Sequence, residues 1–226
     1  MSEANSSPMP CSPVFKFWER KCLHLRDLNP IFSKITQAKN IVAISNYKTS
    51  REIEELSDKY DCILRFNSGA NPKVLKDKNK FYNGRVDVAV LNGWNQGFFG
   101  DLNEFKDIPV LFSRPKKDEN DFQPINPSGT FLVRNNFLDK FNHNNYAFIS
   151  YQVYLDFIEK YKCIHPSSGL LTLFFIKNYL NSSIEGINFL ADDEMYNTFL
   201  KKKALNHTFE VEKSIFSDLK IENIII

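Results

Sequence analysis

The chain has 226 residues, of which 42% are hydrophobic, and a formal net charge of +2 at pH 7. This length supports one sizeable hydrophobic core, and the balanced charge excludes the strong global basicity that draws a protein to nucleic acid. No apolar span is long enough to cross a bilayer, and no secretory h-region with a cleavage site is present, so nothing marks the chain as secreted.

The N-terminal part differs in composition from the rest of the chain. Residues 1–13 are rich in Ser and Pro, which predicts a disordered tail. Residues 14–35 mix aromatic and basic side chains, which favours a helix that docks on the domain or on a membrane surface. We therefore expect an N-terminal tail with a docking helix over residues 1–35 and one folded domain over residues 36–226.

From residue 40 onward, apolar runs alternate with helical patterns. The run that starts at Asn40 breaks into small polar residues near Ser45, which predicts a strand, a tight turn and a helix start. A second strand is predicted between Tyr60 and Asn67. The remaining patterns predict helices over 51–60, 146–161, 168–180 and 208–219, and strands over 85–91, 108–112 and 184–189. Strands separated by helices indicate an α/β, Rossmann-like single domain, in which helices cover both faces of a mostly parallel sheet.

A serine-rich segment, His165-Pro-Ser-Ser-Gly169, runs directly into an apolar helical stretch. Ser167 and Ser168 offer hydroxyls, and Gly169 offers an exposed N–H group, at a helix start where the helix dipole favours an anion. The same residues also make an ordinary helix cap. The local chemistry leaves both interpretations open.

Three other segments carry polar residues suited to chemistry. Asn46 and Asn67 each stand just past the carboxyl end of a predicted strand, where an amide either forms a turn or contacts a nucleotide. His207 begins the last predicted helix and is followed five residues later by Glu212. A histidine pKa near neutrality suits a general base, although a helix-start histidine and a surface glutamate are the plain alternatives.

Taken in chain order, these segments resemble the sialyltransferases, both the animal enzymes and the bacterial enzymes that decorate lipooligosaccharide. The family's motifs read roughly VGNGPSL, DxVxRFN, PSSG or PSTG, and H-x4-E, and the resemblance spans roughly residues 40–219. Segments 84–87 and 186–189 resemble its G-x-x-D and G-x-D-F motifs. The positions that match the four main motifs are Asn46, Thr49, Asn67, Ser168, Gly169, His207 and Glu212.

The resemblance implies a GT-A-like variant of the Rossmann fold that transfers sialic acid from CMP-sialic acid to a terminal sugar of a bacterial surface glycan such as lipooligosaccharide. The implied reaction inverts the anomeric centre and needs neither metal nor cofactor. His207 would be the general base and Glu212 its catalytic partner. The implied donor contacts are Ser45, Asn46, Thr49, Asn67, Ser167, Ser168, Gly169 and Tyr196.

Two alternatives stay open, and both concern the donor site. The donor is either CMP-sialic acid or another CMP-sugar such as CMP-Kdo. Ser45 and Tyr47 stand where the family has glycines, Asn188 replaces an Asp, and no His-Tyr motif precedes His207, which leaves a catalytically inactive nucleotide-binding relative as the second alternative. The absence of an anchor and stem resembles the bacterial, cytoplasmic type, with peripheral attachment to the inner face of the cytoplasmic membrane.

The acidic and sulfur-bearing residues give no metal pattern. Asp192, Asp193 and Glu194 superficially resemble an acidic metal motif, but they lie outside the donor motifs and fit a helix N-terminus. The four cysteines form no C-x-x-C pair and have no histidine at zinc spacing. Cys62 and Cys163 are expected to be buried thiols. The resemblance implies a disulfide between them as an alternative, because the animal enzymes link the corresponding regions.

Overall fold

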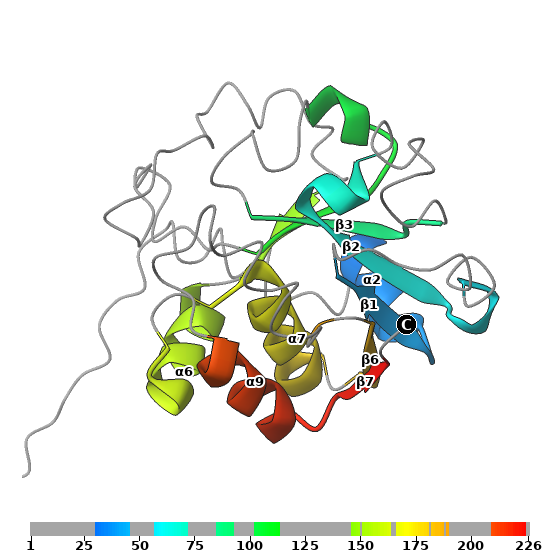
Figure 1. The fold of residues 1–226 in the computed structure, drawn as a ribbon. Coiled ribbons are helices and arrows are strands. Elements are labelled where there is room, and N and C mark those ends of the chain that lie inside the picture. The colour runs from blue at the N-terminus through cyan, green and yellow to red at the C-terminus, as the bar shows by residue number, and fades with distance from the viewer. Residues whose placement is uncertain are drawn as a thin grey trace, which may run out of the picture.

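The computed structural model describes residues 30–45, 57–71, 85–92, 102–113, 146–149, 151–163, 166–180, 182–187, 189 and 209–224. These residues form a seven-stranded sheet with helices packed against it (Figure 1). Every neighbouring pair of strands runs parallel. The predicted α/β, Rossmann-like single domain is confirmed.

Strand β1 lies inside the sheet, and the order in which the chain adds strands reverses next to β1. The order is β5-β4-β3-β2-β1-β6-β7, so the chain moves outward from β1 to β5 and then returns to β6 on the other side of β1. In open parallel sheets, a crevice for ligands forms at the carboxyl ends of the strands where the order reverses. The strands are β1 (Ile41–Ile44), β2 (Cys62–Phe66), β3 (Val88–Leu91), β4 (Val110–Phe112), β5 (Tyr146–Phe148), β6 (Ile184–Ile187) and β7 (Glu222–Ile224).

Four helices in the described part of the chain pack on one face of this sheet, and the described residues do not test the prediction that helices also cover the other face. The buried side chains of these four helices form a single apolar cluster with alternate strand residues such as Ala43, Leu64 and Val90. The other set of strand residues forms a second, smaller cluster on the opposite face, to which Tyr60 contributes. The helices are α2 (Pro30–Gln37), α6 (Tyr151–Tyr161), α7 (Ser168–Tyr179) and α9 (Phe209–Asp218), and short 3-10 turns span Ser57–Lys59, Asn67–Ala70 and Leu102–Phe105.

Helix α7 is the central helix of the larger cluster. Every residue from Gly169 to Ile176 is buried, and a helix that is apolar on all sides is a core helix. Figure 1 shows α7 between the sheet and the helices α6 and α9. Each fully buried leucine, isoleucine or phenylalanine contributes about 1.5 to 3 kcal/mol. The packing of α7 therefore fixes the position of its N-terminus relative to the sheet.

Most predicted elements are confirmed to within three residues at their ends. The helix predicted over 51–60 lies mostly outside the described residues, and its described end is the 3-10 turn Ser57–Lys59. One predicted helix is wrong at its start. The helix predicted over 146–161 begins only at Tyr151, because Tyr146–Phe148 form β5. Tyr, Ala and Phe pair in parallel with β4, and the Ile149 N–H donates to the Phe112 carbonyl, so sheet pairing overrides the helical pattern. Strand β7 was not anticipated.

The predicted boundary at residue 35 falls within α2. Pro30 occupies the first turn, where its missing N–H costs nothing, and Ile31 and Ile35 are fully buried in the larger cluster. This helix is thus part of the domain core. Of the helices in the described part of the chain, none is long and apolar enough to span a membrane.

Candidate functional site

Four neighbouring strands are each followed directly by a small polar residue. Ser45 follows β1, Asn67 follows β2, Asn92 follows β3 and Ser113 follows β4. Ser45, Asn92 and Ser113 are buried and Asn67 is half-buried. Because parallel strands end at the same side of a sheet, these residues form a polar carboxyl edge beside the point where the strand order reverses.

Asn67 adopts a left-handed backbone conformation with φ of 45°, which asparagine tolerates better than most residues. Its side-chain Oδ1 accepts a hydrogen bond from the Asn92 N–H at 2.9 Å. This bond fixes the orientation of the Asn67 side-chain amide. Asn92 was not among the predicted site residues, although it carries the same signal as Asn67, a polar residue directly after an apolar run.

Arg65 lies within β2 and is fully buried. Its Nε donates to the Gly69 carbonyl at 3.0 Å, and its Nη1 donates to the Ser45 carbonyl at 3.0 Å. The guanidinium stays charged at all ordinary pH values. Arg65 was not among the predicted site residues, although it stands at the Arg of the DxVxRFN motif and is a cation inside an otherwise apolar strand.

Ser167 caps helix α7. Its backbone is extended (φ −62°, ψ 156°), and its Oγ accepts a hydrogen bond from the Leu170 N–H at 3.2 Å. Glu212 of α9 accepts a hydrogen bond from the Ser167 N–H through Oε1 at 3.0 Å. The capping interpretation of this segment is therefore confirmed for Ser167. The N–H groups of Ser168 and Gly169 lie in the first turn of α7, where they have no partner within the helix, and groups of this kind can bind an anion.

Phe189 joins the start of α7 to the end of β2. A Cβ added at Gly169 would lie 2.6 Å from Phe189 Cε1, so the glycine permits this close contact. The Phe189 ring also packs edge-on against Phe66, with 5.5 Å between ring centroids, and tilted against Phe216 at 5.8 Å. Phe66 directly precedes Asn67 in the chain. Phe189 belongs to the segment resembling G-x-D-F, but its packing role was not anticipated.

These contacts place part of the predicted site together. Ser45, Asn67, the Ser167–Gly169 segment and Glu212 all lie at the carboxyl edge, linked through Arg65 and Phe189. The Ser45 N–H also donates to the Ile187 carbonyl at the end of β6, on the far side of β1. Four predicted site residues fall outside the described residues: Asn46, Thr49, Tyr196 and His207.

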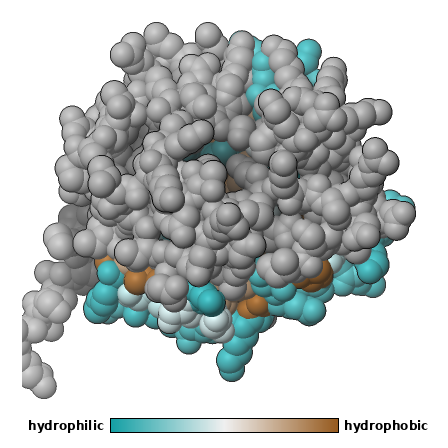
Figure 2. Space-filling view, in the orientation of Figure 1, coloured by the Kyte–Doolittle hydropathy of each residue, from teal (hydrophilic) through white to brown (hydrophobic). Residues whose placement is uncertain are grey.

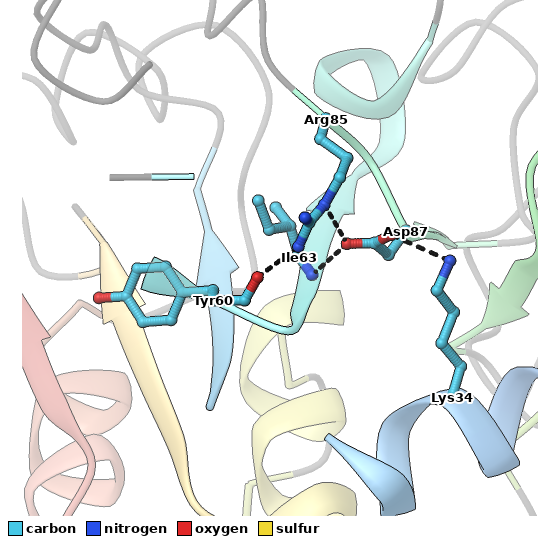
Figure 3. Close-up of polar contacts among 5 residues, drawn as sticks. All are labelled: Lys34, Tyr60, Ile63, Arg85 and Asp87. Atoms are coloured by element: carbon cyan, nitrogen blue, oxygen red, sulfur yellow. Dashed lines mark hydrogen bonds and ion pairs between the residues drawn. The ribbon is translucent and has the colours of Figure 1, made fainter. Parts of the chain in front are cut away.

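The opposite, amino edge of the sheet carries a compact charge network (Figure 3). Asp87 accepts hydrogen bonds from the Ile63 N–H at 3.0 Å and from Arg85 Nε at 2.8 Å, and it pairs with Lys34 Nζ at 2.9 Å. Arg85 also donates to the Tyr60 carbonyl. This network joins α2, β2 and β3, and its charged groups pair with one another.

Cys62 and Cys163 are free thiols, so the disulfide implied by the resemblance is absent. Cys62 is buried as expected, and Cys163 is half-buried. Burial, followed by the negative charge of Asp87, raises the pKa of the Cys62 thiol to about 12. Within the described ranges no group of three His, Cys, Asp or Glu residues could hold a metal, and residues 192–194 lie outside those ranges.

The visible surface of the helical end is mainly hydrophilic. In Figure 2, the described residues in the lower part of the view are mostly polar, with apolar residues between them. Leu155 of α6 and Val211 of α9 are the large hydrophobic residues that stand exposed among the described residues. Scattered exposure of this kind is ordinary for a folded domain.

No known family model matches this chain, and no curated protein matches it either. The class that the fold defines is an α/β protein with a Rossmann-like parallel sheet. The site geometry and the motif resemblance are therefore the basis for a functional proposal.

Proposed function

We propose that this protein is a CMP-sugar-dependent glycosyltransferase that moves sialic acid to a terminal sugar of a bacterial surface glycan such as lipooligosaccharide. The observation that carries the proposal is the hydrogen bond between Glu212 and the Ser167 N–H. It joins the two C-terminal motifs, 45 residues apart, at the edge of the sheet where Asn67 follows β2. We propose that the enzyme is cytoplasmic, with peripheral attachment to the inner face of the cytoplasmic membrane.

The donor carries a single phosphodiester attached to the anomeric carbon. The N–H groups of Ser168 and Gly169, the Ser168 hydroxyl and the positive end of the α7 dipole suit this phosphate. The Asn67 amide, held by Asn92, suits the ribose or the phosphate. Asn46, Thr49 and Tyr196 complete the proposed donor contacts from the sequence. A single phosphate held by such donors does not require a metal ion.

In the proposed reaction, an acceptor hydroxyl oxygen attacks the anomeric carbon while the bond from that carbon to the phosphate oxygen breaks. CMP leaves with the electron pair, and the anomeric centre inverts. His207 takes the hydroxyl proton as the new bond forms. His207 stands two residues before the first residue of α9, and Glu212 on α9 is bonded to the start of α7. This bond holds the two helix starts in one arrangement.

A nucleotide-binding protein without catalysis is the second candidate. Ser45, at the end of β1, stands where the resembling family has a glycine, and it is buried. A Cβ at this position narrows the approach of a nucleotide to the backbone. Binding of CMP without turnover of any CMP-sugar would favour this candidate.

Thermal unfolding in the presence of nucleotides tests the proposal. CMP and CDP should raise the melting temperature, whereas UDP and GDP should not, and a ligand at about 100 times its dissociation constant adds about 2.7 kcal/mol. Release of CMP from CMP-sialic acid and from CMP-Kdo then identifies the donor, and turnover should survive EDTA. Equal stabilisation by UDP would contradict the proposal.

A further inference from the structure

The buried guanidinium of Arg65 has no explanation in core packing. Interior strands of parallel sheets are usually filled by aliphatic side chains, and the strand neighbours of Arg65 in register are Ile44 and Ala89. A charged group loses its hydration when it is fully buried, and hydrophobic residues of similar volume are often at least as stabilising. The contribution of the Arg65 guanidinium must therefore come from the groups to which it is hydrogen-bonded.

Arg65 holds two segments that leave the sheet. The Ser45 carbonyl belongs to the first residue after β1, and the Gly69 carbonyl belongs to the 3-10 turn that follows β2. Main-chain carbonyls in such segments no longer face a neighbouring strand and need other donors. The planar guanidinium supplies two N–H groups in a fixed geometry, so the distance between the two segments is set by one rigid group.

Both segments carry proposed donor contacts. Ser45 is itself one of these contacts and is followed in the chain by Asn46, while the turn held at Gly69 begins with Asn67 in its left-handed conformation. Asn67 in turn bonds to the Asn92 N–H. Arg65 therefore connects the ends of β1 and β2, and Asn67 connects the end of β2 to the end of β3.

We propose that Arg65 is a positioning residue, which presets the spacing of the Ser45 and Asn67 segments for binding of the CMP moiety. This role rests on the proposed function, because it concerns the same nucleotide site. It predicts that Arg65 acts on CMP affinity beyond its effect on stability.

The test compares two arginines that both bond a main-chain carbonyl. Arg65→Met removes the contacts at the carboxyl edge, and Arg85→Met removes the contacts to Tyr60 and Asp87 at the amino edge. CMP binding is measured by calorimetry at a temperature where each variant is folded by circular dichroism, and unfolding is measured separately. We expect Arg65→Met to weaken CMP binding by about ten- to a hundredfold, the cost of a small misplacement of binding groups. Arg85→Met should lower the melting temperature and leave the CMP dissociation constant within about twofold.

Arg65→Lys is the conservative variant. Its ammonium keeps the charge but cannot reproduce the planar two-point contact, so we expect an intermediate loss of CMP affinity. Parent-like CMP binding by either folded Arg65 variant, or an equal loss in Arg85→Met, would overturn the positioning role while the proposed function stands. If neither Arg65 variant folds, the arginine is a requirement of the fold and the positioning role is likewise overturned. Absence of CMP binding in the parent would instead refute the proposed function, and the positioning role with it.

Discussion

The two edges of the sheet use polar residues in opposite ways. At the amino edge, Asp87 is surrounded by Lys34, Arg85 and the Ile63 N–H, and Asp61 accepts hydrogen bonds from the N–H groups of residues 39 and 40. Opposite charges there neutralise each other and tie segments together. The carboxyl edge instead presents neutral amides and hydroxyls above a buried cation, next to the positive end of helix α7.

We propose that this difference separates stability from nucleotide binding. Charged groups that pair with one another stabilise the fold and interact only weakly with a ligand. Aligned hydrogen-bond donors that face a crevice favour the binding of an anion. We expect substitutions at the amino edge to change the free energy of unfolding and substitutions at the carboxyl edge to change nucleotide binding or turnover. Five predictions test this division.

The largest effect is expected for His207→Ala. If His207 takes the proton from the acceptor hydroxyl, its loss removes an interaction of the transition state only, and the transfer rate should fall by about 10²- to 10⁴-fold. CMP binding should stay normal, and the parent's rate should fall as the pH drops through the histidine pKa. Initial rates of CMP release across a pH series measure both. An unchanged rate would leave His207 as a helix-start histidine.

Asp87→Ala should give the largest loss of stability. It leaves the Ile63 N–H without its acceptor and removes the partner of Lys34 and Arg85, and because both cations are partly exposed we expect a loss of about 2 to 4 kcal/mol. Urea unfolding measures this loss. CMP affinity should not change, and a clear loss of affinity in the folded variant would contradict the division between the two edges.

Asn67→Ala should show the reverse pattern. It removes the proposed donor amide and the bond to the Asn92 N–H, and CMP binding should weaken by about 1 to 3 kcal/mol. Ser168→Ala should weaken CMP binding within the same range. Calorimetric titration with CMP measures both, and parent-like binding by the two variants would place the nucleotide elsewhere.

Gly169→Ala tests the packing that holds the start of α7. The new methyl group would meet Phe189 Cε1 at 2.6 Å, so we expect a loss of about 1 to 3 kcal/mol in the free energy of unfolding. Phe189→Leu in the same chain should restore part of this loss, because the smaller side chain makes room. If the double variant recovered no free energy of unfolding, a clash with the Phe189 ring would not be the reason that residue 169 must be glycine.

The smallest effect concerns Cys62. Its thiol pKa is raised from an ordinary 9.0 to about 12, so the thiol is protonated in the folded protein while the unfolded chain ionises near pH 9. The unfolded state loses its proton first, and stability should therefore be full below pH 9 and decline between pH 9 and 12, by about 1 kcal/mol at pH 10.

Cys62→Ala is the control for this decline, because it lacks the titrating thiol. The parent should lose about 1 kcal/mol more than Cys62→Ala between pH 8 and pH 10 in urea unfolding. Peptide mapping after iodoacetamide treatment should label half-buried Cys163 before buried Cys62. Equal labelling rates in the folded protein would contradict the buried, protonated thiol.

The sequence located the fully buried strands β1, β2 and β3. The apolar runs of β1, β2 and β3 are continuous because both faces of these strands are covered, and this pattern is readable locally. The strands β5 and β7 were not predicted. Tyr146–Phe148 directly precede a helical pattern, and Glu222–Ile224 are partly exposed, so neither shows a period of its own.

By itself, the sequence determined which residues stand at strand and helix ends, and hence made Asn67 and the Ser167–Gly169 segment candidates for contacts to a ligand. Only the tertiary structure decided their partners. Asn92 lies 25 residues from Asn67, and Glu212 lies 45 residues from Ser167. The physical reason is that local spacing fixes the ends of elements, whereas strand order and the packing of α7 and α9 on the sheet decide which ends meet.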